Sequence, residues 1–256
     1  MLTDVRHHAV VDLIHHVGAL SVPELAARFG VSEATARRDL DQLAARGLVE
    51  RVRGGAKVPR SPIRPEADAS PFEVVAGQEP REKRAIARRA AALVADGDVV
   101  ALDIGTTVFA MCEHLRSRDL TVVTASLAVV RALSDAPGID LVVMGGVLRP
   151  NYESLVGVLT ESCLRQVRVD IAFLGASGIR PDGAVLDSTP SEVPVKRAMI
   201  EIANRAWLLA DHKKFPGIGF LEVVPVERFT GLVTDAPLTP SQLTLPPDTT
   251  LEVLTA

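Results

Sequence analysis

Small, hydroxylated and charged residues follow short apolar runs at several points in this 256-residue sequence. The clearest example is Asp103-Ile104-Gly105-Thr106-Thr107, which ends the run VVALD and opens a predicted helix. Gly105 allows the backbone to approach an anion closely. The amides and hydroxyls of Thr106 and Thr107 would lie at the positive end of that helix, where phosphate groups bind readily. The segment therefore predicts a phosphate-binding loop.

Further strand ends carry residues of the same kind, at 124–126 (Thr-Ala-Ser), 145–146 (Gly-Gly), 175–178 (Gly-Ala-Ser-Gly) and 211–215 (Asp-His-Lys-Lys-Phe). In an open parallel sheet the ligand binds outside the carboxyl ends of the strands. Because these segments would meet at that edge, together they predict a site for a polar, phosphorylated ligand.

Some of these residues also have interpretations without a ligand. Glu192 and Lys196 stand four residues apart on a predicted helix, which is equally typical of a surface ion pair. Asp103 could simply cap the helix that follows it. Asp211 and Lys214 directly follow an apolar strand, which favours a role in binding. Another predicted helix, with the residue before it, carries the basic residues Arg81, Lys83, Arg84, Arg88 and Arg89. We interpret them as a solvated helix face or an oligomer contact.

The elements that would position these residues alternate along the chain. We expect strands at 99–103, 120–125, 139–146, 171–177, 207–211 and 231–235, and a hairpin-like insert after 146. We expect helices at 82–95, 105–115, 126–134, 159–167 and 191–204. Strands joined by helices predict a parallel sheet covered on both faces. The composition, 47% hydrophobic but only 4% aromatic, indicates an aliphatic core.

Residues 21–57 are predicted to form a helix-turn-helix followed by a β-wing, after a first helix at 4–17. Ser21 begins a capping box, with a glutamate three residues later. Gly30 is suited to end the helix in a left-handed conformation. Ser32 then caps a second helix. This order of signals is typical of a DNA-binding module.

The second helix has the features of a recognition helix. Its N-terminal half, the part that enters the major groove, carries Thr35, Arg37 and Arg38. An arginine fork can bond to guanine or to a phosphate with two hydrogen bonds. The hairpin that follows would bring Arg51 and Arg53 to the DNA backbone. A small helical cap with a solvated arginine face is the alternative. The predicted DNA-binding residues are Ser32, Thr35, Arg37, Arg38, Arg51, Arg53, Gly54 and Gly55.

Charge is distributed unevenly along the chain. The net charge is −4, yet between Arg28 and Arg60 eight Lys or Arg residues face four acidic ones, a net +4. The positive potential is therefore local to the predicted DNA-binding segment.

The segment 31–56, VSEATARRDLDQLAARGLVERVRGGA, closely resembles the N-terminal domain of DeoR-family transcriptional repressors. The second half resembles the sensor domain of that family, which is similar in fold to ribose-5-phosphate isomerase. The segments that carry this second resemblance include EKRAIA (82–87), GTT (105–107), LGASGI (174–179), VKRAMI (195–200) and ADHKKF (210–215). The resemblance implies a repressor of sugar metabolism genes that is controlled by a phosphorylated sugar.

The resemblance also implies where the effector binds. Asp103, Gly105, Thr106 and Thr107 would hold the sugar phosphate. Further contacts are implied for Ser126, Lys196, Asp211 and Lys214, and the strand-end residue Gly175 is a candidate beside them.

Prolines at 59, 62, 65, 71 and 80 predict an interdomain linker. We therefore expect a winged helix-turn-helix (α+β) domain at 1–58, a linker at 59–75 and a sugar-phosphate-sensing α/β domain with a mostly parallel sheet at 76–256. The expected partners are double-stranded operator DNA, the phosphorylated sugar and further copies of the chain, in a dimer or a larger even assembly.

Several classes of site are not expected. Cys112 and Cys163 lack the spacing of metal ligands and are interpreted as free thiols in a reducing cytoplasm. The pairs His7–His8 and His15–His16 lack a completing cluster, so solvated or phosphate-adjacent histidines are preferred over metal ligands. We expect no cofactor and no metal. The absence of an apolar run of ~18 residues and of a signal pattern predicts a soluble cytoplasmic protein without membrane contact.

Two enzyme functions remain as alternatives. A phosphosugar isomerase could use Glu192, Lys196 and Asp211 to move a proton between adjacent carbons. A sugar kinase could use DIGTT as a phosphate loop, but such kinases need two large lobes. A fused helix-turn-helix gives a sensor its output and adds little to a catalytic domain. These considerations favour a non-enzymatic transcriptional regulator.

Overall fold

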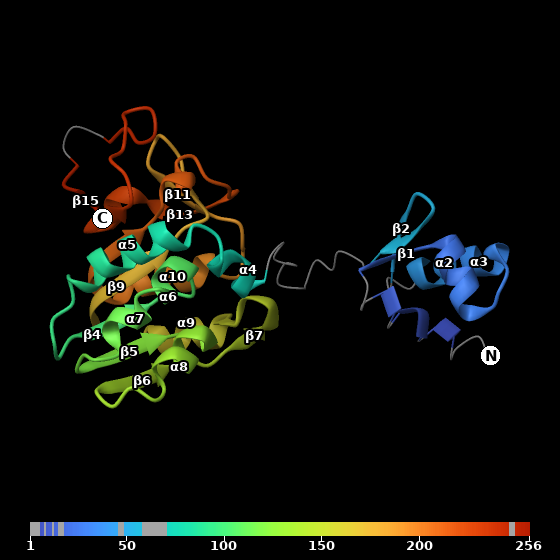
Figure 1. Ribbon diagram of the computed structural model, residues 1–256, viewed down its shortest axis with the longest axis horizontal. Coiled ribbons are helices and arrows are strands. Elements are labelled where there is room, and N and C mark those ends of the chain that lie inside the picture. Colours follow the sequence, from blue (N-terminus) through green and yellow to red (C-terminus); the bar gives the residue numbers. More distant parts are fainter. Residues whose placement is uncertain are drawn as a thin grey trace. The chain divides into compact units, whose positions relative to one another are not determined.

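The computed structural model describes residues 6–7, 9–11, 13–14, 18–45, 49–57, 71–245 and 249–256. The chain divides into two compact units, Met1–Arg64 and Pro65–Ala256 (Figure 1). Most of the expected linker lies outside the described residues. Its last part, however, is helical: α4 spans Phe72–Ala76, and Phe72 is buried.

The N-terminal unit has the predicted winged helix-turn-helix architecture. Its described elements are β1 (Ala19–Ser21), α2 (Val22–Phe29), α3 (Glu33–Ala45), β2 (Glu50–Val52) and β3 (Gly55–Lys57), and residues 6–7, 9–11 and 13–14 are also helical. The strands form an antiparallel sheet in the order β1-β3-β2. Strand β1 was not predicted, because residues 19–21 were interpreted only as the entry to the helix.

The local signals at the start of α2 act as predicted. The Ser21 backbone N–H donates to Glu24 Oε2 at 3.0 Å, and the Glu24 backbone N–H donates to Ser21 Oγ at 3.4 Å. Gly30 ends the helix with φ +63°. Ala36, Leu40 and Leu43 of α3 are fully buried, as expected for the face that packs on the other helices.

In the second unit, the described residues form one seven-stranded sheet in which all neighbouring strands are parallel. Its order is β15-β14-β12-β9-β4-β5-β6. The strands are β4 (Val99–Leu102), β5 (Leu120–Thr124), β6 (Ile139–Val143), β9 (Val169–Gly175), β12 (Ala203–Leu209), β14 (Gly231–Thr234) and β15 (Glu252–Thr255). The predicted parallel sheet is confirmed, and β15 adds an edge strand that the sequence did not indicate.

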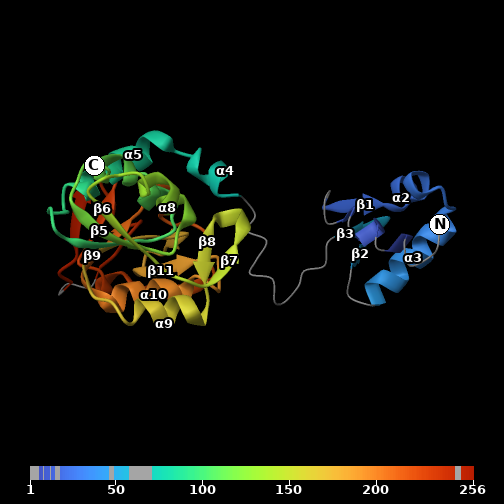
Figure 2. The same ribbon diagram turned by 90° about the horizontal axis from the view of Figure 1, so that it is seen from below.

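Helices cover both faces of this sheet, and residues alternate between two aliphatic clusters along each central strand. Ile171 and Phe173 of β9 pack in one cluster, whereas Ala172 and Leu174 pack in the other. Figure 2 shows α5 and α8 on one side of the sheet and α9 and α10 on the other. The helices after α4 are α5 (Pro80–Ala91), α6 (Thr106–Phe109), α7 (Cys112–Leu115), α8 (Leu127–Leu133), α9 (Val158–Leu164) and α10 (Val193–Ile202).

Two smaller sheets complete this unit. The expected hairpin-like insert is formed by β7 (Val147–Arg149) and β8 (Ser154–Val156). An unpredicted antiparallel sheet has the order β10-β11-β13, with β10 at Gly178–Ile179, β11 at Ala184–Asp187 and β13 at Leu221–Pro225. In the sequence, the strands of both small sheets follow the carboxyl ends of strands of the large sheet. Residues of the small sheets can therefore line a site at that edge.

One predicted helix differs in form. The helix expected at 105–115 is broken after Phe109 into α6 and α7. Its macrodipole is therefore that of a single turn, and anion binding at its start must depend more on nearby cations than the sequence suggested. No helix among the described residues is long and apolar enough to cross a membrane.

Candidate functional sites

The recognition helix α3 is anchored by a buried carboxylate. Asp39 accepts hydrogen bonds from Arg6 Nε at 2.7 Å and from Arg6 Nη2 at 3.1 Å, and it lies 3.1 Å from His7 Nε2. Burial alone would raise the pKa of Asp39, but the bonds to Arg6 and His7 outweigh it and the pKa is lowered. The interpretation of His7 as solvated is wrong, because His7 is buried against Asp39. His8, His15 and His16 lie outside the described residues.

The opposite side of α3 offers side chains to a ligand. Ser32 Oγ accepts from the backbone N–H of Thr35 at 3.2 Å and so caps the helix. Arg37 and Arg38 are exposed. Arg37 pairs with Glu33 at 3.0 Å. Arg38 makes no hydrogen bond or ion pair with another described residue, so its guanidinium fork is available for a base or a phosphate.

Some of the predicted wing residues face solvent, and others make contacts that build the wing. Arg53 and Gly54 form the exposed turn between β2 and β3, and Gly54 has φ +85°. Arg51 is held by contacts on the surface of the unit, with Nε 2.9 Å from Asp41 Oδ1 and Nη1 donating to the Gly55 carbonyl at 2.7 Å. Gly55 is buried, and a Cβ there would lie 2.2 Å from the Leu20 carbonyl oxygen. Arg51, Arg53 and Gly54 are all exposed, and of the two arginines Arg53 makes no hydrogen bond or ion pair with another described residue.

In the second unit, a cavity of about 340 Å³ opens at the carboxyl ends of β4 and β9. These neighbouring strands mark the point where the strand order reverses, since the chain proceeds from β4 to β5 and β6 on one side and from β9 to β12 and β14 on the other. Such a switch point is where ligands bind in open α/β sheets. The cavity is large enough for a small metabolite.

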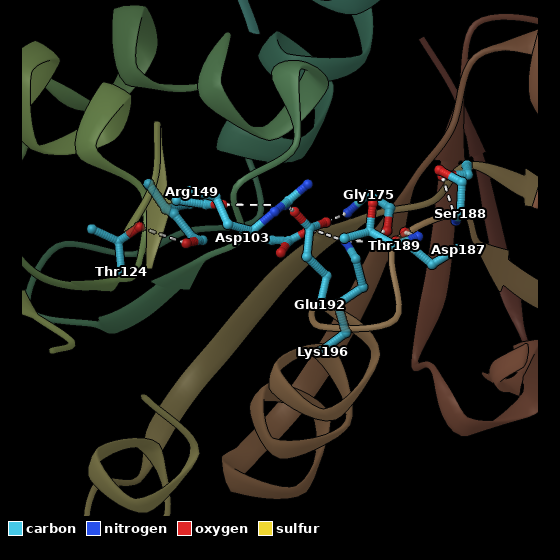
Figure 3. A network of polar contacts seen from close by, with 12 residues as sticks. Asp103, Thr124, Arg149, Gly175, Asp187, Ser188, Thr189, Glu192 and Lys196 are labelled. Atoms are coloured by element: carbon cyan, nitrogen blue, oxygen red, sulfur yellow. Dashed lines mark hydrogen bonds and ion pairs between the residues drawn. The ribbon is translucent and has the colours of Figure 1, made fainter. Parts of the chain in front are cut away.

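A buried ammonium group lines this cavity. Lys196 of α10 forms an ion pair with Asp103 Oδ2, donates to the Gly175 carbonyl at 3.0 Å and lies 3.6 Å from Asp187 Oδ2 (Figure 3). Asp103 Oδ2 also accepts the Gly175 N–H at 3.0 Å. Burial alone would lower the pKa of Lys196, but the carboxylates of Asp103 and Asp187 outweigh it and the pKa is raised.

A second buried ion pair joins the hairpin to α10. The guanidinium of Arg149 at the end of β7 contacts Glu192, as Figure 3 shows, and donates to Ser154 Oγ at 3.3 Å. Its Cζ lies 5.7 Å from the centre of the Tyr152 ring. The interpretation of Glu192 and Lys196 as a surface ion pair is therefore wrong, because both are buried and each contacts a partner on another element.

Two further lysines line the cavity. Lys83 of α5 and Lys214 of the short helix η2 (His212–Lys214) line it, together with Thr106 and Thr107. The Lys83 amine donates to the Val75 carbonyl at the end of α4. Lys83 is buried, so its assignment to a solvated helix face is wrong, whereas Arg81, Arg84, Arg88 and Arg89 are exposed as expected.

The nine predicted effector residues fall into two groups. The residues that line the cavity are Gly105, Thr106, Thr107, Gly175, Lys196 and Lys214. Asp103 is not among the lining residues, but it contacts two that are, Lys196 and Gly175. Ser126 is fully buried and caps α8 by accepting the Val129 N–H at 3.2 Å. Asp211 is buried and caps η2 by accepting the Lys213 N–H at 3.0 Å.

Sequence reasoning missed several lining residues. Asp187, Ser188 and Thr189 follow β11, a strand of the sheet that was not predicted, and Tyr152 belongs to the hairpin. The clustered polar residues Asp-Ser-Thr after a short apolar run were the signal that could have found the first group. No group of three or more His, Cys, Asp or Glu residues suited to a metal occurs among the residues that the structure describes.

The ion cluster around Lys196 predicts a large effect of one substitution. Lys196→Met leaves two carboxylates buried without their cation, so it should lower the free energy of unfolding of the sensor domain by ~3–5 kcal/mol. Because the pKa of Lys196 is raised in the folded state, its stabilisation is fully present below the ordinary lysine value of 10.5 and is lost only as the pH rises through the raised value.

Urea unfolding at pH 7 measures this effect. The matched control is Lys213→Met, since Lys213 pairs with Glu79 at the surface and its side chain is 60% exposed. The control should change the free energy of unfolding by less than ~1 kcal/mol. A Lys196 variant as stable as the control would contradict the structural role of the cluster.

Comparison with known proteins places this architecture in a family. Two family models match the chain, the DeoR-like helix-turn-helix domain over residues 6–62 and the DeoR C terminal sensor domain over residues 78–236. The glycerol-3-phosphate regulon repressor of Escherichia coli (strain K12) is 33% identical over 98% of this chain and 94% of its own length. The HTH-type transcriptional repressor GlcR of Bacillus subtilis (strain 168) is 33% identical over 92% of this chain and 89% of its own length.

A solved structure of ribose 5-phosphate isomerase A from Methanocaldococcus jannaschii is similar over 52% of each chain, with 20% identity and a TM-score of 0.38. The two family matches and the full-length relatives confirm the prediction of a transcriptional regulator and not an enzyme. The chain belongs to the DeoR family of transcriptional repressors, with a helix-turn-helix that binds DNA and a C-terminal domain that senses an effector.

Proposed function

We propose that this repressor controls genes of sugar or polyol phosphate metabolism in the cytoplasm, and that its effector is a small phosphorylated sugar or polyol. The effector binds in the switch-point cavity, and its binding alters the affinity of residues 1–58 for operator DNA through the linker at 59–75. The observation that carries the proposal is the lining of one cavity by two lysines without ion pairs among the described residues, together with several hydroxyl and carboxylate side chains.

The lining residues suit the two parts of such a ligand. Lys214 forms no ion pair with another described residue, so a phosphate would supply the missing negative charge. Thr106 and Thr107 add hydroxyls and the first N–H groups of α6, which have no acceptor within the helix. Ser188, Thr189 and Asp187 also line the cavity and offer partners for sugar hydroxyls.

The name of one relative supports the same class of ligand. The Escherichia coli protein that matches 98% of this chain is a repressor of the glycerol-3-phosphate regulon. We extend to this chain only the chemical class, a phosphate ester of a small polyhydroxylated carbon chain.

The buried contacts are evidence against catalysis in the same cavity. The residues considered for proton transfer are all engaged, since Glu192 contacts Arg149, Lys196 contacts Asp103, and Asp211 caps η2. A general acid or base must reach the substrate with a proton to exchange. These side chains instead hold the cavity in shape, which is what a sensor requires.

The DNA-binding proposal predicts different effects for two arginines. Arg38→Ala should weaken binding to the specific operator by ~1–3 kcal/mol, because a bidentate base contact is lost. Arg53→Ala should weaken binding to specific and random duplexes alike and lower the salt slope by about one, because a phosphate contact is lost. Fluorescence anisotropy with both duplexes measures this, and Arg88→Ala in the sensor domain is the control. Equal operator affinity of the Arg38 variant and the parent would refute the placement of α3 in the groove.

The sensing proposal predicts a loss of response without a loss of DNA binding. Thr106→Val and Lys214→Ala should leave operator affinity within about twofold of the parent. Both should abolish the change in operator affinity that sn-glycerol 3-phosphate, fructose 6-phosphate or ribose 5-phosphate causes in the parent. Anisotropy with and without each compound decides it, with Lys213→Ala as the matched control beside Lys214. Normal responses in both variants would place the effector elsewhere.

We further propose that the protein acts as a dimer or larger even assembly joined through the sensor domain. Two half-sites read by paired modules supply specificity that one helix-turn-helix lacks. Exposed apolar side chains on β6, β7 and α9 support this assignment, since burying them against a second copy would stabilise an assembly. They are Val142, Val143, Val147, Leu148, Val158 and Leu159.

The assembly proposal is tested by charge at this surface. Leu159→Glu in the full chain should dissociate the assembly, because a carboxylate would be buried at the contact without a partner. Sedimentation of the parent and the variant at the same concentration measures this. Val253→Glu, an exposed position on the opposite edge strand β15, is the control. A parent that sediments as a monomer would refute the assembly itself.

A further inference from the structure

Lys83 is unusual among the buried cations of the sensor domain. The residue is 6% exposed, and it lines both the switch-point cavity and a second cavity of about 390 Å³. Lys196 and Arg149, which are equally buried, each contact a carboxylate. For Lys83 the described residues provide no ion pair, only the hydrogen bond to the Val75 carbonyl.

A buried ammonium without an ion pair is costly, since it has lost most of its hydration. Burial lowers the pKa of Lys83 to about 8, with Lys214 lowering it further and Asp211 and Glu79 opposing. An anion in the cavity would restore the missing charge. Lys83, Lys214 and Thr106 all line this cavity, which makes them candidate contacts for such an anion.

The same amine holds α4 in place. Val75 at the end of α4 lines the cavity, and its carbonyl accepts the Lys83 hydrogen bond. At the start of α4, Phe72 packs edge-on against Phe109 of α6 at 5.3 Å and against Tyr152 at 5.6 Å, measured between ring centres. The helix is thus held by one aromatic cluster and one lysine.

The joint between α4 and α5 is under backbone strain. Glu79 has φ +47°, a left-handed conformation that is uncommon for a residue other than glycine. Its side chain pairs with Lys213, next to Lys214. Such strain persists only where surrounding contacts enforce it, and it is concentrated at switching elements. Residues of this joint line both cavities: Gln78 lines the switch-point cavity and Pro80 lines the second one.

We propose that Lys83 binds the anionic group of the effector and, in doing so, gives up its hydrogen bond to Val75, so that α4 is released when the cavity is occupied. In sequence, α4 is the first described element after the DNA-binding unit. Its release therefore transmits the binding of the effector to the segment that joins the two units. This inference rests on the proposed function. It adds to that function the residue that both contacts the effector and transmits its binding to α4.

The binding step is tested with Lys83→Met, which keeps the apolar stem, and Lys83→Arg, which keeps the charge. The probe is whichever of sn-glycerol 3-phosphate, fructose 6-phosphate and ribose 5-phosphate binds the parent most tightly by calorimetry. Lys83→Met should reduce its affinity on the order of tenfold or more, whereas Arg84→Met, an exposed neighbour on α5, should not change it. Thermal unfolding of each variant establishes that it is folded.

A pH profile separates a binding role from a packing role. The affinity of the parent for the probe should fall between pH 7 and pH 9, as the amine with a pKa of about 8 loses its proton. The charged groups that act on this amine are Asp211, Lys214 and Glu79, and all remain in the Lys83→Arg variant. Because a guanidinium stays charged over this range, the profile of that variant should be flatter than that of the parent.

The release step is tested by hydrogen exchange of the full-length protein. In the parent, the probe should increase deuterium uptake in residues 71–79, whose amides are held by bonds such as Gly77 N–H to the Glu73 carbonyl at 3.0 Å. In Lys83→Met, uptake there should already be high and should not respond to the probe.

Each outcome bears on one step. Unchanged affinity in folded Lys83→Met, or a parent pH profile as flat as that of Lys83→Arg, would overturn the binding role. A probe that binds without changing exchange in 71–79 of the parent would overturn the release of α4. A parent that binds none of the phosphorylated probes would instead overturn the proposed function on which the inference rests.

Discussion

The sensor domain depends on one buried ammonium. Lys196 of α10 joins Asp103 after β4, the Gly175 carbonyl at the end of β9 and Asp187 at the end of β11, so a single charge ties four elements at the point where the strand order reverses. Removing either charge from such a buried pair costs far more than the pair contributes as a whole. The cavity that opens there is consequently shaped before any ligand arrives, and a preformed site binds with little loss of conformational entropy.

Charge balance then decides which residues of the cavity accept an anion. Around Lys196 and Arg149 each positive group already has a carboxylate, and an anion there would be repelled. Lys83 and Lys214 line the cavity without ion pairs among the described residues. The short helix α6 contributes a single turn of dipole. Electrostatics thus favours an anionic group at Lys83 and Lys214, and Lys83 is hydrogen-bonded to α4, the first described element after the DNA-binding unit in sequence.

The elements that local patterns encode were predictable. The capping box at Ser21, the left-handed Gly30 and the alternation of apolar strands with helices depend on neighbours in sequence, and each formed as expected. Contacts made across the fold were not predictable. Glu192 and Lys83 carry the spacing of surface residues, and only their distant partners Arg149 and Val75 make them internal.

Edge and insert strands escaped prediction for a related reason. β1 and β15 are short, and each is stabilised by pairing with β3 or β14 and not by its own sequence. Gly55 illustrates the same limit: it was assigned to DNA, whereas the close approach of the Leu20 carbonyl requires a glycine there.

A crystal structure of the full chain with its phosphorylated effector tests the central claim most directly. The account predicts the phosphorus atom in the switch-point cavity beside Lys214, with its oxygens in hydrogen-bond contact with Lys214 and Thr106, and the carbon chain in contact with Asp187 and Thr189. An effector found in the reverse orientation, or bound outside this cavity, would contradict it.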